Sequence, residues 1–113
     1  MKEIKAIIQP FKLQKVIDAL KEIPHMPGVT VSEVKGFGRG RAENVANNET
    51  QWGVLCVTKL KLETVVADEM VTQILEAIQK HAHTGNVGDG KIFIYEVQDV
   101  VKIRTNESGE KAI

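Results

Sequence analysis

Hydrophobic and polar residues alternate at the start of the chain, which is the period of a half-buried strand. The apolar members of this alternation are Ile4, Ala6 and Ile8. The pattern then changes to the spacing of one helical face, occupied by Leu13, Val16, Ile17 and Leu20. Pro10 suits the beginning of this helix and Pro24 its end, because proline disfavours helical backbone in the residue before it. The first part of the chain therefore predicts a strand followed by a helix.

The same two periods return in the rest of the chain. Alternation predicts a strand over residues 29–34 that runs on toward Gly38, and another over residues 54–66. A second helical face follows, made of Ala67, Met70, Val71, Ile74, Leu75 and Ile78. A β-type run over residues 91–101 precedes a polar tail. The strand–helix–strand–strand–helix–strand order predicts a ferredoxin-like α+β fold, with an antiparallel sheet and both helices on one face.

Both faces of the predicted strands carry apolar residues, so the face without helices also needs a cover. A closed ring of identical subunits would provide one. The net charge is zero, from 15 basic and 15 acidic residues, which is compatible with self-association. The same balance argues against nucleic-acid binding, which usually needs a basic surface.

The length of 113 residues fits a single domain, residues 1–113. Cys56 is the only cysteine, so no intrachain disulfide can form and a reducing compartment is favoured. The sequence shows no signal peptide and no apolar segment long enough to enter a membrane. We therefore expect a cytoplasmic location without membrane insertion.

Residues 36–53 are largely polar and lack an apolar period. Loops this long in a small domain are usually functional or mobile. Glycines and arginines gather at its start, which favours a functional loop over a plain connector.

Three glycines occur close together in residues 84–90, immediately before Lys91. Because glycine lacks a Cβ, such a loop can turn sharply and its N–H groups can surround an anion. Lys91 adds a positive charge suited to phosphate. The spacing is not that of the P-loop nucleotide motif. The local sequence favours either a phosphate-binding loop or a simple Gly-Asp-Gly turn.

Four longer motifs resemble one family when they are taken together. They cover residues 7–13, 30–39, 84–97 and 101–105. In this order they closely resemble the PII signal-transduction proteins, which are trimeric sensors of cell energy and nitrogen status. The resemblance covers the whole chain. It implies a T-loop over about residues 37–54, a phosphate-binding B-loop over residues 84–91 and a C-terminal tail over residues 102–113.

The resemblance also implies that ATP and ADP, with Mg²⁺, compete for the clefts between subunits. One subunit face would contribute Ile7, Thr30, Gly36, Phe37, Gly38, Arg39 and Val65. The B-loop would surround the phosphates with Gly88, Asp89, Gly90 and Lys91. Lys102 and Arg104 would reach them from the neighbouring subunit, with Lys102 replacing the family's usual arginine.

The opening motif carries Gln9 where a lysine is usual in the family. Two other positions bear on a second effector. Gly40 replaces a glutamine whose amide oxygen helps to hold Mg²⁺ and 2-oxoglutarate. Lys59 matches the lysine that contacts the distal carboxylate of 2-oxoglutarate. Since Gly40 has no side chain to coordinate a metal, the sequence argues against strong 2-oxoglutarate binding. A weaker site, or a site for another small anion such as bicarbonate, stays open.

The tip of the predicted T-loop also differs from many PII proteins. Trp52 stands where they carry a tyrosine that accepts a nucleotidyl group, and an indole has no hydroxyl for that reaction. We therefore expect no such modification and a target of this protein's own, whether an enzyme, a regulator or a membrane transporter. Arg41 and Trp52 are the candidate contacts to this unidentified partner, because exposed tryptophans often anchor interfaces.

Two other functions compete with that of a nucleotide sensor that regulates a partner. Each of them would depend on different residues. A trimeric metal- or anion-responsive protein of the same fold would have as candidate metal ligands His25, Met26, Cys56, His81 and His83, but their spacing matches no known zinc pattern. A slow ATPase would need a general base, for which Asp89 is the nearest carboxylate. Because aspartate is common in turns for structural reasons, we predict a protein that is not an enzyme.

Overall fold

The computed structural model describes residues 1–37, 48–51 and 54–113. Its strands are β1 (Lys2–Ile8), β2 (Thr30–Gly36), β3 (Asn48–Gln51), β4 (Val54–Val66) and β5 (Gly90–Glu96). Its α-helices are α1 (Leu13–Lys21) and α2 (Val71–Ala82). Short 3₁₀ turns precede these helices and lie near the C-terminus: η1 (Pro10–Lys12), η2 (Asp68–Met70) and η3 (Glu110–Ala112).

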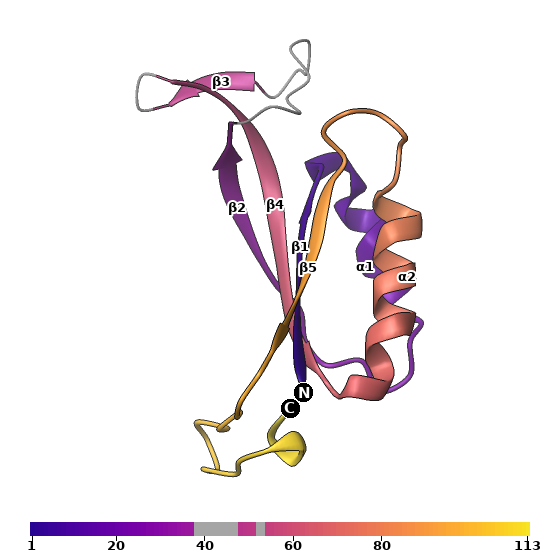
Figure 1. Ribbon diagram of the computed structural model, residues 1–113, viewed down its shortest axis with the longest axis vertical. Coiled ribbons are helices and arrows are strands. Elements are labelled where there is room, and N and C mark those ends of the chain that lie inside the picture. Colours follow the sequence, from indigo (N-terminus) through magenta and orange to yellow (C-terminus); the bar gives the residue numbers. More distant parts are fainter. Residues whose placement is uncertain (38–47, 52–53) are drawn as a thin grey trace.

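The strands form one antiparallel sheet in the order β2-β4-β1-β5, and β3 extends it by pairing with β4. Both α-helices lie on the same side of this sheet (Figure 1). β1 is central, so Ile8 lies opposite Leu60 of β4 on one side and Gly90 of β5 on the other. This arrangement confirms the predicted ferredoxin-like α+β fold.

The hydrophobic core fills the space between the sheet and the two helices. The alternating residues of β1 that predicted a strand are its centre, and Ile4, Ala6 and Ile8 are at most 1% exposed. The helices contribute the buried side chains Val16, Leu20, Ile74 and Ile78. Of the helices that the structure describes, neither is long and apolar enough to cross a lipid bilayer.

The other face of the sheet carries a mixture of charged and aromatic residues. The ammonium of Lys5 lies 4.8 Å from the ring centre of Tyr95, and Lys61 pairs with Glu63 at 3.6 Å. Phe93 and Tyr95 are 41% and 44% exposed. The ring of identical subunits that would cover this open face stays a prediction.

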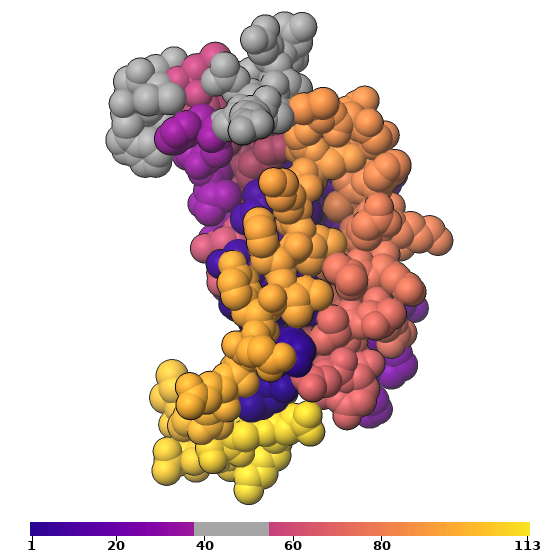
Figure 2. All heavy atoms as spheres, viewed as in Figure 1, coloured from indigo at the N-terminus to yellow at the C-terminus, as the bar shows by residue number. Residues whose placement is uncertain are grey.

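The chain after β5 differs from the sequence prediction. β5 ends at Glu96 rather than at residue 101, and Val101 makes only an isolated bridge to Ser108. The amide of Lys102 donates to the Glu107 carbonyl over 2.8 Å, and the amide of Asn106 donates to the Lys102 carbonyl over 2.7 Å. The predicted extension of the last strand to residue 101 is therefore wrong, and the tail instead closes a tight turn through these hydrogen bonds. Figure 2 shows this tail in yellow, at the opposite end of the molecule from the loop between α2 and β5.

A further difference falls within the long loop between the second and third predicted strands. β3 pairs with residues 54–57 of β4, although its Asn-Glu-Thr-Gln sequence has no apolar alternation. Backbone pairing alone defines this strand, so the hydrophobic pattern gave no sign of it. Gly38, Arg39, Gly40, Arg41 and Trp52 lie outside the described residues.

Candidate functional site

The loop between α2 and β5, residues 84–89, turns sharply at its glycines. Gly85 and Gly88 have φ values of 90° and 101°, and Gly90, the first residue of β5, has a φ of 99°. Side-chain-bearing residues rarely adopt such values. The glycine content that predicted this loop is thus a requirement of its backbone.

Gly90 is also held against the central strand. A Cβ at this position would lie 1.7 Å from the carbonyl oxygen of Ile7. No side chain fits there without moving the backbone of β1 or β5. Gly90 therefore fixes the loop directly against the end of β1.

Asp89 closes the loop from within. Its Oδ2 atom accepts hydrogen bonds from the amides of Thr84 (2.7 Å) and Gly85 (2.9 Å), and its Oδ1 atom accepts one from the Thr84 hydroxyl. That hydroxyl in turn accepts the Asn86 amide at 3.0 Å. The sequence predicted a phosphate contact for Asp89 and no role for Thr84. A threonine five residues before an aspartate in a glycine loop was the available signal.

The electrostatics of Asp89 follow from these contacts. Burial raises the pKa of its carboxyl, but the hydrogen bonds from Thr84 and Gly85, together with the nearby His83, lower it more. The pKa of Asp89 therefore lies below its ordinary value, and the group is a carboxylate at neutral pH. Its oxygens already accept hydrogen bonds from Thr84 and Gly85, so its chief role is to hold the loop in this conformation.

Lys59 of β4 reaches the same loop. Its ammonium donates a hydrogen bond to the carbonyl of Gly88. Desolvation lowers the pKa of Lys59, and attraction to the Asp89 carboxylate partly opposes this. Lys59 thus places a partly buried cation beside the glycine backbone.

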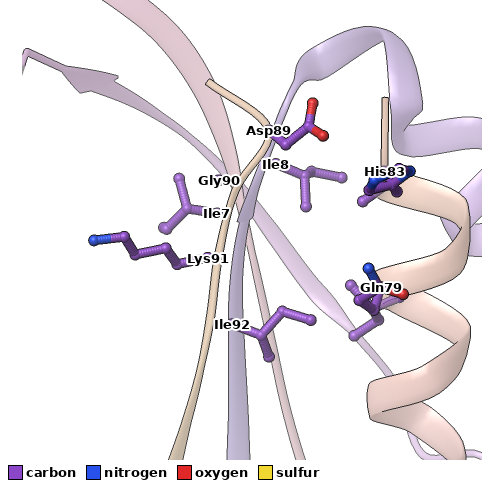
Figure 3. Close-up of a pocket in the computed structure, with 10 residues that line it drawn as sticks. Ile7, Ile8, Gln79, His83, Asp89, Gly90, Lys91 and Ile92 are labelled. Atoms are coloured by element: carbon purple, nitrogen blue, oxygen red, sulfur yellow. The ribbon is translucent and has the colours of Figure 1, made fainter. Parts of the chain in front are cut away.

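A pocket of about 290 Å³ lies where the loop meets α2 and β5. Figure 3 shows that Ile8 and Ile92 point toward α2, where Gln79 and His83 lie, whereas Lys91 points to the opposite face of the sheet. Lys91 is next to Ile7 in register. The predicted site residues of β1 and β5 therefore face away from the helices, on the open face.

Gly36 and Phe37 lie at the same end of the sheet as this loop. Gly36 is paired with Val57 of β4, beyond the level at which Leu60 pairs with Ile8. Phe37 is 60% exposed. The structure thus gathers one group of predicted residues at this end, which we call the loop-end group: Ile7, Gly36, Phe37, Lys59, Gly88, Asp89, Gly90 and Lys91.

A second group lies at the other end of the sheet. Thr30 is opposite Glu63, and Val65 is opposite Glu3, beside a pocket of about 320 Å³. Thr30 is six residues along β2 from Gly36, roughly 20 Å at about 3.3 Å per residue. Within one chain, the strand register therefore separates Thr30 and Val65 from the loop-end group.

The predicted basic residues of the tail belong to this second end. The amide of Val97 donates to the Met1 carbonyl at 3.1 Å, which places the start of the tail beside the first residue of the chain. The Lys102 ammonium lies 4.0 Å from the Glu107 carboxylate, and Arg104 is exposed. Thr30, Val65, Lys102 and Arg104 form what we call the tail-end group.

The candidate metal ligands lie in three separate regions, which are the turn before β2, strand β4 and the end of α2. Cys56 is buried in β4, His25 lies in the turn before β2, and a ring nitrogen of His81 lies 2.9 Å from the carbonyl of Ala77. Within the described ranges, no three His, Cys, Asp or Glu residues come close enough together to hold a metal ion. These residues give a metal-responsive function no support.

Comparison with known proteins fits this geometry. The chain matches the sequence model of the family described as nitrogen regulatory protein P-II over residues 1–107. The chain belongs to the P-II family. It is 48% identical to the nitrogen regulatory protein P-II of Azospirillum brasilense, 47% identical to that of Pasteurella multocida and 46% identical to that of Rhodospirillum rubrum. Each alignment covers all 113 residues of this chain and all of the relative.

Membership of the P-II family confirms the resemblance found in the sequence. P-II proteins are regulatory signal transducers and not enzymes. The chain is accordingly a signal-transduction protein of the nitrogen-regulatory class. The family alone does not define which nucleotide, effector or target this protein binds.

Proposed function

We propose that this P-II protein senses adenine nucleotides by binding ATP or ADP, with Mg²⁺, and regulates a partner in nitrogen-related control. The observation that carries the proposal is the placement of two lysines. Lys59 and Lys91 lie on β4 and β5, on the same face of the sheet, with β1 between them. They flank the end where Gly88 and Gly90 bring the loop backbone against β1. Two cations beside a glycine-rich backbone suit a polyphosphate.

The separation of the two groups supports a site between copies of the chain. Lys102 and Arg104 belong to the tail that starts beside Met1, whereas Lys91 lies opposite Ile7, near the other end of β1. They can share one ligand with Lys91 only if two copies contribute one group each. A homotrimer in which the open faces meet would bring the loop-end group of one subunit to the tail-end group of the next.

The predicted T-loop, with Arg41 and Trp52, is the proposed contact to the target. ATP and ADP would change target binding only if they favour different loop conformations, since a ligand shifts an equilibrium by its difference in affinity for two states. The cytoplasmic location and the choice of target stay predictions.

The first experiment is calorimetric titration of the purified protein with ATP and with ADP in the presence of Mg²⁺. We expect Kd values in the micromolar range. Lys91→Ala should weaken binding roughly tenfold or more, as expected for loss of a charged contact. Lys80→Ala is the matched control, because Lys80 is an exposed lysine on α2. Absence of nucleotide binding by the unaltered protein would refute the proposal.

A second experiment tests whether two copies share the site. Lys91→Ala and Arg104→Ala proteins should each bind ATP poorly. When the two are co-expressed, mixed rings should regain intact sites wherever an unaltered Lys91 meets an unaltered Arg104. If both variants bind poorly and the mixture regains no binding, the shared site is wrong.

A further inference from the structure

A pocket of about 620 Å³ lies outside both the loop-end group and the tail-end group. It is lined by the last turns of α1 and by the segment that connects α1 to β2. Figure 1 shows this connecting segment at the end of the helices away from the loop between α2 and β5. Small-molecule sites commonly enclose about 300–1,000 Å³. This pocket is therefore large enough to hold a small ligand.

The walls of this pocket are largely apolar. Leu20 and Ile23 are 2% and 7% exposed and belong to the hydrophobic core. Ile17, Met26 and Val29 pack against the same core and also line the pocket. Because apolar surface is more favourable against apolar groups than against water, these walls would stabilise the apolar part of a ligand.

Two basic residues border the pocket. Lys21 lies in the last turn of α1 and His25 in the turn that follows, and no carboxylate is among the described residues that line the pocket. Lys21 forms no ion pair with any residue that the structure describes. Asp18, one helical turn earlier, accepts a hydrogen bond from Gln14 at 2.8 Å. The charges at the pocket therefore favour an anionic group.

The turn beside the pocket is fixed by its own backbone. The carbonyl of Ile23 accepts the Met26 amide at 3.3 Å. Pro24 and Pro27 restrict the backbone before and after His25, which has a φ of 60°. A positive φ is uncommon for a residue with a side chain, although histidine adopts it more often than most. A site that is fixed beforehand loses less conformational freedom when it binds a ligand.

We propose that this pocket binds a medium-chain fatty acid, with the carboxylate at Lys21 and His25 and the hydrocarbon chain along the apolar walls. A ligand with one anionic end and an apolar chain matches both parts of the pocket, whereas a small dicarboxylate would match only the basic residues. The pocket shares only Gly28 with the pocket beside Thr30 and Val65. The proposal therefore does not depend on the proposed nucleotide function.

The test is calorimetric titration of the full-length protein, without nucleotide, with octanoate, hexanoate and octanol. Octanoate should bind roughly tenfold more tightly than hexanoate, as expected for two additional buried methylene groups. Octanol keeps the chain but lacks the carboxylate, so it should also bind roughly tenfold more weakly than octanoate. Absence of octanoate binding would overturn the proposal, as would an equal affinity for octanoate and either of the other two compounds.

Variants of the basic residues test where the carboxylate lies. Lys21→Gln should weaken octanoate binding roughly tenfold, the loss expected for one charged contact. Lys15→Gln is the matched control, because it removes an exposed lysine from the same helix, and it should leave the affinity unchanged. His25→Gly removes the imidazole and keeps a φ that glycine readily adopts, so it should also weaken binding. All three positions are exposed, and thermal unfolding checks that each variant is folded.

Methyl NMR signals test where the hydrocarbon chain lies. Octanoate should shift the methyl signals of Ile17 and Ile23 and leave those of Ile103, which is fully exposed, unchanged. Equal shifts at all three would show detergent-like association and would overturn the proposal. Equal effects of Lys21→Gln and Lys15→Gln would also overturn it. Displacement of octanoate by Mg-ATP would place it in the nucleotide site and would refute the separate pocket without affecting the proposed function.

Discussion

The loop at residues 84–89 and the turn at residues 97–109 are built alike but constrained differently. Each has an aspartate that accepts backbone amides. Asp89 holds Thr84 and Gly85, and Asp99 holds Val100 at 2.8 Å and Gly109 at 3.0 Å. Each also contains glycine with a positive φ. The difference lies in what surrounds them.

A Cβ at Gly90 would lie 1.7 Å from the Ile7 carbonyl oxygen, whereas a Cβ at Gly109 would have nothing within 4 Å. The loop is therefore fixed by tertiary contact with the central strand, whereas the tail turn is held by its own hydrogen bonds, by the bond from the Val97 amide to the Met1 carbonyl and by an exposed ion pair. Similar hydrogen bonds therefore occur in a loop that packs against the central strand and in a tail turn whose Gly109 has open space around it.

The largest expected effect comes from adding a methyl group at each glycine. Gly90→Ala should lose on the order of 4 kcal/mol of unfolding free energy, because a backbone clash adds to the unfavourable φ. Gly109→Ala should lose about 1–2 kcal/mol, from φ alone. Denaturant unfolding at equal protein concentration measures both. Equal losses at the two sites would contradict the contrast drawn between them.

The next largest difference in unfolding free energy is expected between variants of the two aspartates. Asp89→Asn should lose about 1–2 kcal/mol of unfolding free energy and weaken the protection of the Thr84 and Gly85 amides against hydrogen exchange, since charged acceptors make the stronger bonds. Asp99→Asn, in the weakly held turn, should lose less. Comparable losses of unfolding free energy in the two variants would show that the tertiary contact of the loop does not strengthen the hydrogen bonds of Asp89.

The pKa of Asp89 gives this difference a pH dependence. Its pKa is lower in the folded protein than its ordinary value of about 3.9. The carboxylate therefore stabilises the fold above about pH 4, and this contribution is lost as the pH falls through the lowered folded pKa. The stability gap between the unaltered protein and Asp89→Asn should narrow below pH 4. A stability gap that stays constant down to pH 2 would refute the stabilising role of the Asp89 carboxylate.

The smallest expected effect concerns the ion pair of the tail. Lys102 and Glu107 are both partly exposed and 4.0 Å apart, and surface pairs of this kind contribute little. Glu107→Gln should change the unfolding free energy by less than about 0.5 kcal/mol. A loss above about 1 kcal/mol would mean that the turn is held more firmly than its contacts indicate.

The elements with an apolar period could be predicted from the sequence, and the others could not. β1, α1 and α2 bury one face each, so the positions of Ile4, Val16 and Ile74 carry the signal directly. β3 pairs through its backbone and has no such period. The end of β5 was misplaced because Val97, Val100 and Val101 continue an apolar run that the backbone does not follow.

The glycine loop of the candidate site could be predicted from the sequence, but the pairing of the strands around it could not. The glycines and Lys91 are visible as a motif. The sequence does not show which residues of β4 lie opposite Thr30 and Gly36, because this pairing depends on the register of the sheet. Nor does it show that the Asp89 carboxylate is occupied within its own loop, or that the amide oxygen of Gln9 has no donor among the residues that the structure describes.

The contact between Gly90 and the Ile7 carbonyl also has a genetic consequence. Any single-nucleotide change in the first two positions of a glycine codon introduces a side chain or a stop. Every nonsynonymous change at position 90 therefore places a side chain against the backbone of β1 or stops the chain, whereas position 109 is limited by backbone preference. In a library of all single substitutions, replacements should be rarer at position 90 than at position 109.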